Sequence, residues 1–233
     1  MNTVQDNLLN IKNEIAKIAK KCERDPNTIQ LIAVSKTKPV EQVIQAINAG
    51  QLAFGENYVQ EGVEKIQYFE KNMPNSDLIW HFIGPLQSNK SKLVAEHFDW
   101  MHTIDRLKIA QRLNNQRPKD MAKLNVLIQV NISQEASKSG VKPEEVADLV
   151  KQIVTLPNLN LRGLMAIPEI ENDYDKQLNI FTKMQQLLQS LQKDYPFMDT
   201  LSMGMSGDMQ AAIVAGSTMV RIGTAIFGAR QYL

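Results

Sequence analysis

Short apolar runs alternate along the chain with segments in which apolar residues recur at helical spacing. In the first such segment the apolar positions lie three or four residues apart: Leu8, Ile11, Ile15 and Ile18. That spacing places them on one face of an amphipathic helix. The next apolar run, LIAV at 31–34, predicts a buried strand. The segment VEQVIQAINAG that follows predicts a helix ending at Gly50, because glycine is common at helix C-termini.

The same alternation continues to the end of the chain. Apolar runs lie near Leu31, Leu52, Ile79, Phe98, Val126, Leu159, Leu201 and Met219. Their mean spacing of about 27 residues is the length of one strand plus one crossover helix. Eight such units predict an α/β fold of the (β/α)8 TIM-barrel type with an extra N-terminal helix. A doubly wound open sheet is the alternative, because periodicity does not show whether a sheet closes. No linker divides the chain, so we expect a single domain over residues 1–233.

Composition narrows the class of protein. Lys and Arg total 26 against 25 Asp and Glu, a net charge of +1, which gives no general attraction to nucleic acids or anionic membranes. Cys22 is the one cysteine, so neither an intrachain disulfide nor a cysteine-based zinc cluster is expected. No apolar run approaches the roughly 20 residues that span a bilayer, and the N-terminus does not resemble a signal peptide. We therefore expect a cytoplasmic protein that binds neither nucleic acid nor membrane.

Polar residues at predicted strand ends are the candidates for chemistry, because barrel active sites form there. Lys36 follows the run LIAVS, so its stem should be partly buried. Desolvation lowers the pKa of a lysine and exposes a neutral amine, which can form a Schiff base with an aldehyde cofactor. The alternative is a solvated loop lysine, as we expect for Lys38.

The last two predicted strand ends carry small residues. Ser206 lies in SMGMSGD, and Arg221, Gly223 and Thr224 lie in VRIGT. Small residues let backbone N–H groups converge on an anion, and phosphate sites of these barrels often follow strands seven and eight. Ordinary turn glycines are the alternative. We expect Asp208 to cap the helix that follows.

Familiar catalytic motifs are absent from the sequence. There is no GxxxxGK[ST] or GxGxxG loop, and GMSGD does not match the GxSxG nucleophile elbow. His81, His97 and His102 do not have the spacing of metal ligands. We therefore predict no metal and no catalytic residue of these types.

Long strings of this sequence resemble one known family. They are LIAVSKTKP, FGENYVQE, WHFIGPLQSNK, NVLIQVNISQEASKSG, LRGLMAIPE and LSMGMSGDMQAAIVAGSTMVRIGTAIFGAR. Together they closely resemble the pyridoxal 5'-phosphate homeostasis protein family, from about residue 8 to residue 230. The resemblance implies a barrel like the N-terminal domain of alanine racemase, which is PLP fold type III. It also implies pyridoxal 5'-phosphate bound at the C-terminal ends of the strands.

The resemblance also implies the residues that hold the cofactor. Lys36 of AVSKTKP corresponds to the family lysine that forms the internal aldimine. Ser206 of MGMS, with Gly223 and Thr224 of RIGT, corresponds to the family's phosphate site.

Further residues correspond to the pocket around the cofactor ring. Arg221 of VRIG matches the arginine that faces the pyridine nitrogen. Asn57 of GENYVQ and Met203 of SMGMS match residues that line the ring pocket, and His81 of HFIG lies close to the site. A cation beside the pyridine nitrogen disfavours its protonation and weakens the ring as an electron sink.

These features predict a protein that holds, buffers or delivers pyridoxal phosphate, without robust catalysis. We expect no second domain to supply the further acid/base residue of racemases. The alternatives are a monodomain amino-acid racemase or lyase acting through Lys36, and a barrel isomerase for a phosphorylated metabolite. PLP-dependent apo-enzymes are candidate partners, and we expect a monomer or weak homodimer. Lys138 in EASKSG could act as a secondary aldehyde acceptor or gate, with a solvated loop lysine as the alternative.

Overall fold

Eight parallel strands form a closed barrel in sequence order in the computed structural model, which describes residues 3–133 and 139–229. Each strand pairs with the next, and β8 pairs with β1, so within these residues the barrel closes. The strands are β1 (Gln30–Val34), β2 (Ala53–Glu56), β3 (Ile79–Phe82), β4 (Trp100–Ile104), β5 (Leu124–Gln129), β6 (Leu159–Met165), β7 (Thr200–Ser202) and β8 (Met219–Ile222). The (β/α)8 prediction is confirmed, and the open-sheet alternative is wrong.

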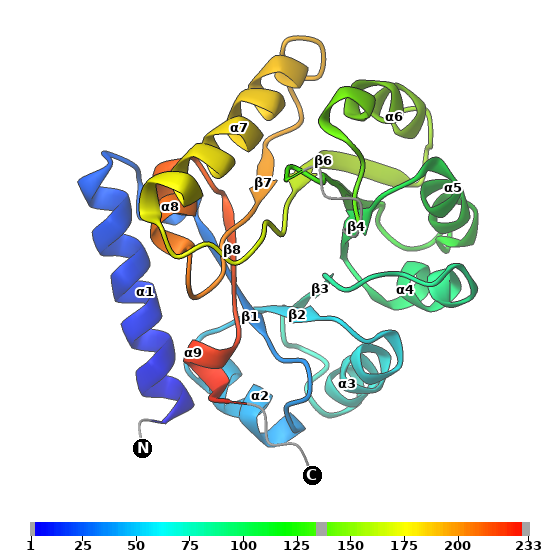
Figure 1. The fold of residues 1–233 in the computed structure, drawn as a ribbon. Helices are drawn as coiled ribbons and strands as arrows, with labels where there is room; N and C mark the ends of the chain where they lie inside the picture. Colours follow the sequence, from blue (N-terminus) through cyan, green and yellow to red (C-terminus); the bar gives the residue numbers. More distant parts are fainter. Residues whose placement is uncertain (1–2, 134–138, 230–233) are drawn as a thin grey trace.

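Helices cover the outside of the barrel, as Figure 1 shows. The helices are α1 (Val4–Lys21), α2 (Val40–Asn48), α3 (Val59–Asn72), α4 (Ser91–His97), α5 (Leu107–Gln116), α6 (Val146–Ile153), α7 (Tyr174–Gln192), α8 (Met209–Val214) and α9 (Thr224–Phe227). The helix predicted to end at Gly50 is α2, and Gly50 has φ 77°, the left-handed conformation that glycine adopts readily. Among the described helices, none is long and apolar enough to cross a membrane.

The extra N-terminal helix packs across the seam where the barrel closes. Thr3 and Asp6 form a capping box, in which Thr3 Oγ1 accepts from the Asp6 N–H and the Asp6 carboxylate accepts from the Thr3 N–H. The predicted apolar stripe is buried: Leu8, Ile11, Ile15 and Ile18. Through this face α1 contacts α2, α8 and α9, the helices next to the first and last strands (Figure 1). The apolar positions recognised in the sequence thus form the packing face of this helix.

The apolar core has two layers. The larger cluster lies between strands and helices and contains large buried side chains such as Phe54, Phe82 and Phe181. A smaller cluster is made of residues from the strands: Ile32, Trp100, Leu127, Met165 and Met219. Alternate residues of a barrel strand face inward, so the smaller cluster fills the barrel interior. This apolar layer shares the barrel interior with buried polar side chains from the strands, among them His81, His102 and Arg221.

Candidate functional site

The residues predicted around Lys36 follow neighbouring strands at the C-terminal end of the barrel. Lys36 is half-buried in the turn after β1, and Gly223 and Thr224 directly follow β8, which pairs with β1. A Cβ on Gly223 would lie 3.3 Å from Cβ of Val34, so this glycine packs against the end of β1. The lysine and the second small-residue loop therefore meet at one edge of the barrel mouth.

The loop after β7 completes this edge. The carbonyl of Gly204 accepts from the N–H of Arg221 at 2.9 Å, and Gly204 has φ 99°. Ser206 in this loop is exposed. Asp208 lies at the N-cap position of α8, but its carboxylate accepts from the N–H of Met205 at 2.5 Å and makes no side-chain bond to the helix. The expected helix-capping bond is therefore replaced by a bond that closes the loop.

Arg221 places a cation beneath this edge. Its side chain is buried, with Nη1 donating to Ser202 Oγ at 2.7 Å and Nη2 donating to the carbonyl of Ala166 at 2.9 Å. Burial lowers the pKa of Arg221 to about 10, and the opposite charge of Asp208 raises it. The guanidinium is therefore charged at neutral pH. These two bonds use two of its five N–H donors and fix its plane.

Two buried histidines continue from Arg221 across the barrel interior. Ser202 Oγ lies 2.9 Å from His102 Nδ1, and His102 Nε2 lies 2.9 Å from His81 Nδ1. His81 stacks on Trp100 with ring centroids 5.4 Å apart. Burial lowers the pKa of His81 to about 3, while burial and the neighbouring His81 and Arg221 hold the pKa of His102 well below its ordinary value. Both imidazoles are neutral. We call Arg221, Ser202, His102 and His81 the histidine chain.

One choice of histidine tautomers gives the histidine chain a single donor direction. Because Arg221 donates to Ser202, the hydroxyl proton of Ser202 can be donated to His102 Nδ1. His102 then carries its proton on Nε2 and donates it to His81 Nδ1. His81 is left with a proton on Nε2, an atom that has no hydrogen-bond partner among the described residues.

The structure places His81 inside the barrel rather than at its open mouth. The side chain is completely buried and reaches Arg221 through His102 and Ser202. Sequence analysis selected neither of these two linking residues as part of the site. The sequence contains one indication of this contact: two histidines lie near the ends of consecutive predicted strands. Consecutive strands of a parallel barrel lie side by side.

Asn57 and Met203 have different surroundings. Asn57 follows β2, and its buried Oδ1 has no hydrogen-bond partner within the described part of the chain. A Cβ on Gly84 would lie 2.0 Å from the carbonyl oxygen of Asn57, so only glycine permits this close approach. Asn57 also lines a cavity of about 310 Å³ at the barrel mouth, together with Thr103 and others. Met203 is completely buried in the larger apolar cluster, and its place in a ring pocket stays a prediction.

Two further lysines, Lys38 and Lys138, were considered in the sequence. Lys38, expected to be solvated, donates to the carbonyls of Phe227, Gly228 and Ala229 at 2.9–3.1 Å. It thus binds the C-terminal end of α9, and the expectation of a solvated lysine is wrong because helix-end carbonyls attract a cation. Lys138 lies outside the described residues.

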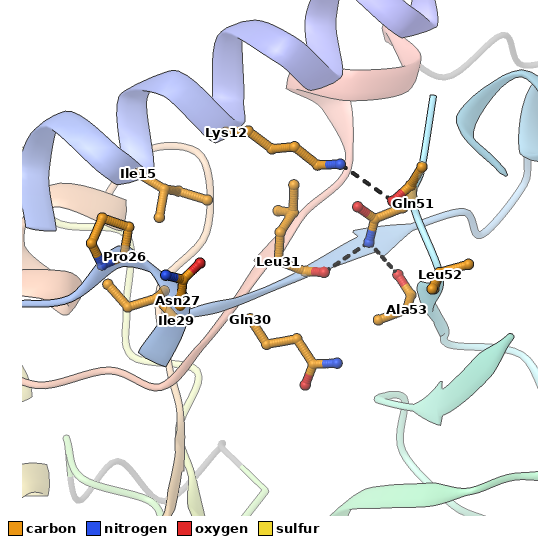
Figure 2. A pocket seen from close by; sticks show the side chains of 11 residues that line it. Lys12, Ile15, Pro26, Asn27, Ile29, Gln30, Leu31, Gln51, Leu52 and Ala53 are labelled. Atoms are coloured by element: carbon orange, nitrogen blue, oxygen red, sulfur yellow. Dashed lines mark hydrogen bonds between the residues drawn. The ribbon is translucent and has the colours of Figure 1, made fainter. Parts of the chain in front are cut away.

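A larger cavity, of about 410 Å³, lies at the opposite end of β1 and is drawn in Figure 2. It lies between α1 and the beginnings of β1 and β2. Gln51 Nε2 donates to the carbonyls of Leu31 and Ala53, and Lys12 donates to the carbonyl of Gly50. None of the predicted site residues lines this cavity. The cavity that a predicted site residue lines is the smaller one at the C-terminal end, where Asn57 contributes to it.

Comparison with known proteins agrees with this architecture. Residues 7–231 match the family model of the alanine racemase N-terminal domain. A pyridoxal phosphate homeostasis protein of Vibrio alginolyticus is 62% identical over 232 residues, covering 100% of both chains. The protein of the same name from Escherichia coli strain K12 is 58% identical, covering 100% of this chain and 99% of the relative.

Solved structures show the same fold. PipY of Synechococcus elongatus PCC7942, solved with PLP bound, is 34% identical with a TM-score of 0.79, over 92% of this chain and 100% of that one. An alanine racemase of Clostridium difficile 630 shares the fold alone, at 18% identity and a TM-score of 0.72, over 97% of this chain and 56% of that one. With close relatives matched along their full length, the chain belongs to the pyridoxal phosphate homeostasis protein family, within the wider family of the alanine racemase N-terminal domain.

Proposed function

We propose that this protein binds pyridoxal 5'-phosphate through Lys36 and holds, buffers or delivers it in the cytoplasm, without robust catalysis of its own. The observation that carries the proposal is the position of Lys36. It lies in the turn after β1, two residues beyond Val34, which packs against Gly223 of the small-residue loop that follows β8. Relatives bear the name pyridoxal phosphate homeostasis protein, and PipY was solved with PLP bound.

The residues at the barrel mouth fit this cofactor. The buried Oδ1 of Asn57 lacks a partner among the described residues, and exposed Ser206 and Thr224 leave room for a phosphate group. Arg221 has N–H donors beyond the two bonded to Ser202 and Ala166. We assign Ser206, Gly223 and Thr224 to the phosphate, and Arg221 to the pyridine nitrogen. When bound, the cofactor supplies an aldehyde that an amine can take up reversibly.

The charge of Arg221 supports holding over catalysis. Catalysis at an amino acid by pyridoxal phosphate uses the ring as an electron sink, and protonation of the pyridine nitrogen strengthens that sink. A guanidinium with a pKa of about 10 remains charged at neutral pH. A second positive charge beside it is electrostatically unfavourable, so the nitrogen stays unprotonated. Reversible capture of the aldehyde needs no such sink.

Borohydride reduction followed by peptide mapping tests the proposal. We expect a phosphopyridoxyl group on Lys36 in the loaded protein, its loss in Lys36→Ala, and its retention in Lys38→Arg, which keeps a cation at α9. Transfer of cofactor to a PLP-dependent apo-enzyme should depend on the same lysine. A label at another lysine in the wild type would contradict the proposal. Amino-acid turnover that disappears in Lys36→Ala would instead favour the racemase or lyase alternative.

A further inference from the structure

Three charged side chains lie behind Lys36 and form a compact, largely buried group. Lys65 of α3 is 5% exposed and donates to Glu56 Oε1 at 2.8 Å and to Glu61 Oε1 at 2.7 Å. Its third bond, at 2.6 Å, goes to the carbonyl of Ser35. An ammonium has three protons, so Lys65 is fully satisfied. We call Glu56, Glu61 and Lys65 the carboxylate–lysine cluster.

The cluster binds the peptide groups on both sides of Lys36. The carbonyl of Ser35, in the peptide group before Lys36, accepts from Lys65. The N–H of Thr37, in the peptide group after Lys36, donates to Glu61 Oε1 at 2.6 Å. Ser35 Oγ also donates to Glu56 Oε1 at 2.6 Å. The φ and ψ angles of Lys36 are the rotations of these two peptide planes, so the cluster fixes both angles.

The backbone next to Lys36 is strained, and the cluster holds it in place. Thr37 has φ 60°, a left-handed conformation that is unfavourable for a β-branched residue. The bond from its N–H to Glu61 helps to hold this conformation, together with the backbone bond from the Lys38 N–H to the Ser35 carbonyl at 3.1 Å. Buried ion pairs also cost desolvation, and well-packed apolar residues often replace them without loss of stability. Stabilisation of the fold alone would therefore not require a strained turn held by buried charges.

We infer that the carboxylate–lysine cluster positions the Lys36 amine for reaction with the cofactor aldehyde. The inference rests on the proposed function, because it concerns the same lysine. In that reaction the amine nitrogen forms a C=N bond, and the aldehyde oxygen leaves as water with the two amine protons. The attack requires the nitrogen to approach the carbonyl carbon from a defined direction. A lysine on a mobile turn would meet this requirement in a smaller fraction of its conformations.

The experiment compares Glu61→Ala with Glu61→Gln and with Glu64→Ala. Glu61→Ala removes the acceptor for the Thr37 N–H, whereas Glu61→Gln keeps an oxygen at that place. Glu64→Ala removes an exposed carboxylate of the same helix and serves as the control. Imine formation is followed by stopped-flow absorbance over a range of pyridoxal phosphate concentrations, with trapping at Lys36 by borohydride as the end point.

Positioning and simple destabilisation predict different kinetics. We expect Glu61→Ala to lower the saturating first-order rate constant about tenfold, the factor for one charge-assisted hydrogen bond. The half-saturating concentration should change by less than about twofold, because the phosphate loops are untouched. Glu61→Gln should restore most of the rate constant, and Glu64→Ala should match the wild type.

Each contrary outcome has a distinct meaning. An unchanged saturating rate constant in Glu61→Ala, with its folded state confirmed by circular dichroism, would overturn the inference. So would a loss confined to the half-saturating concentration, since that indicates weaker binding and not positioning. Absence of any label on Lys36 in the wild type would instead overturn the proposed function.

Discussion

The two histidines inside the barrel should make the protein less stable as the pH falls. His81 and His102 are completely buried, and burial lowers the pKa of His81 from 6.5 to about 3 and that of His102 well below 6.5. In the unfolded chain both imidazoles regain an ordinary pKa and bind protons below about pH 6.5. The unfolded state then binds more protons than the folded state, so acid favours unfolding. The contribution of these neutral histidines to the free energy of unfolding is complete above about pH 6.5. It is lost as the pH falls toward 3.

The size of the effect follows from proton linkage. A group that is neutral when folded and charged when unfolded removes about 1.4 kcal/mol of stability per pH unit below its unfolded pKa. For His81 alone, between about pH 6.5 and pH 4.5, the loss reaches roughly 2–3 kcal/mol, and the lowered pKa of His102 adds to it in the same direction. That amount is a substantial part of the about 5–15 kcal/mol that stabilises an ordinary domain.

Urea unfolding at several pH values between about 7 and about 5 provides the assay. His81→Phe keeps an aromatic ring against Trp100 and removes one of the two buried imidazoles. The slope of unfolding free energy against pH should therefore fall by up to about 1.4 kcal/mol per unit. The hydrogen bond lost by His102 lowers stability at every pH and cancels from the slope. His97→Gln, outside the pair, is the control. Equal slopes for wild type and His81→Phe would refute the reasoning, as would an equal change in the control.

Single substitutions elsewhere test other contacts of the barrel. A Cβ at Gly163 would lie 1.8 Å from the carbonyl oxygen of Thr200, so Gly163→Ala should cost at least about 3 kcal/mol in urea unfolding; a wild-type midpoint would contradict this close pairing of β6 and β7. Lys38→Met removes the donor to three carbonyls at the end of α9 and should cost about 0.5–1.5 kcal/mol, because water can reach two of these bonds. Phe181→Ala should cost about 3–5 kcal/mol, whereas half-exposed Phe197→Ala should cost far less, as thermal unfolding would show.

The order of strands and helices could be predicted because it depends on local pattern. Parallel strands covered by helices are apolar throughout, and the crossover helix sets a spacing of about 27 residues. Each strand–helix unit can therefore be recognised from its own residues. The apolar stripe of α1 likewise needs no knowledge of its partners. Closure of the barrel is different, because it depends on β8 pairing with β1 across nearly the whole chain. The sequence indicated closure only through the number of units.

The contacts of the site were harder to predict, because they join residues far apart in the chain. His102 and Ser202 are 100 positions apart and meet only in the closed barrel. Glu61 and Lys65, at i and i+4 on α3, have the spacing of an ordinary solvated helix pair, yet Lys65 is buried. Nothing local to that helix shows that its lysine faces the end of β1. The sequence could thus single out Lys36 as a candidate, but not the side chains that bind the peptide groups on either side of it.

The two polar groups behind the site differ in electrostatic character, and the difference suggests separate tasks. The histidine chain is neutral beyond Arg221, so it holds the guanidinium by hydrogen bonds without cancelling its charge. The carboxylate–lysine cluster places one ammonium between two carboxylates and bonds to the backbone around Lys36. A charged arginine beside the pyridine nitrogen disfavours its protonation and makes the ring a weaker electron sink than a partner that lets the nitrogen gain a proton. The proposed capture and release of an aldehyde needs a well-placed amine and no strong electron sink, and both groups are consistent with that proposal.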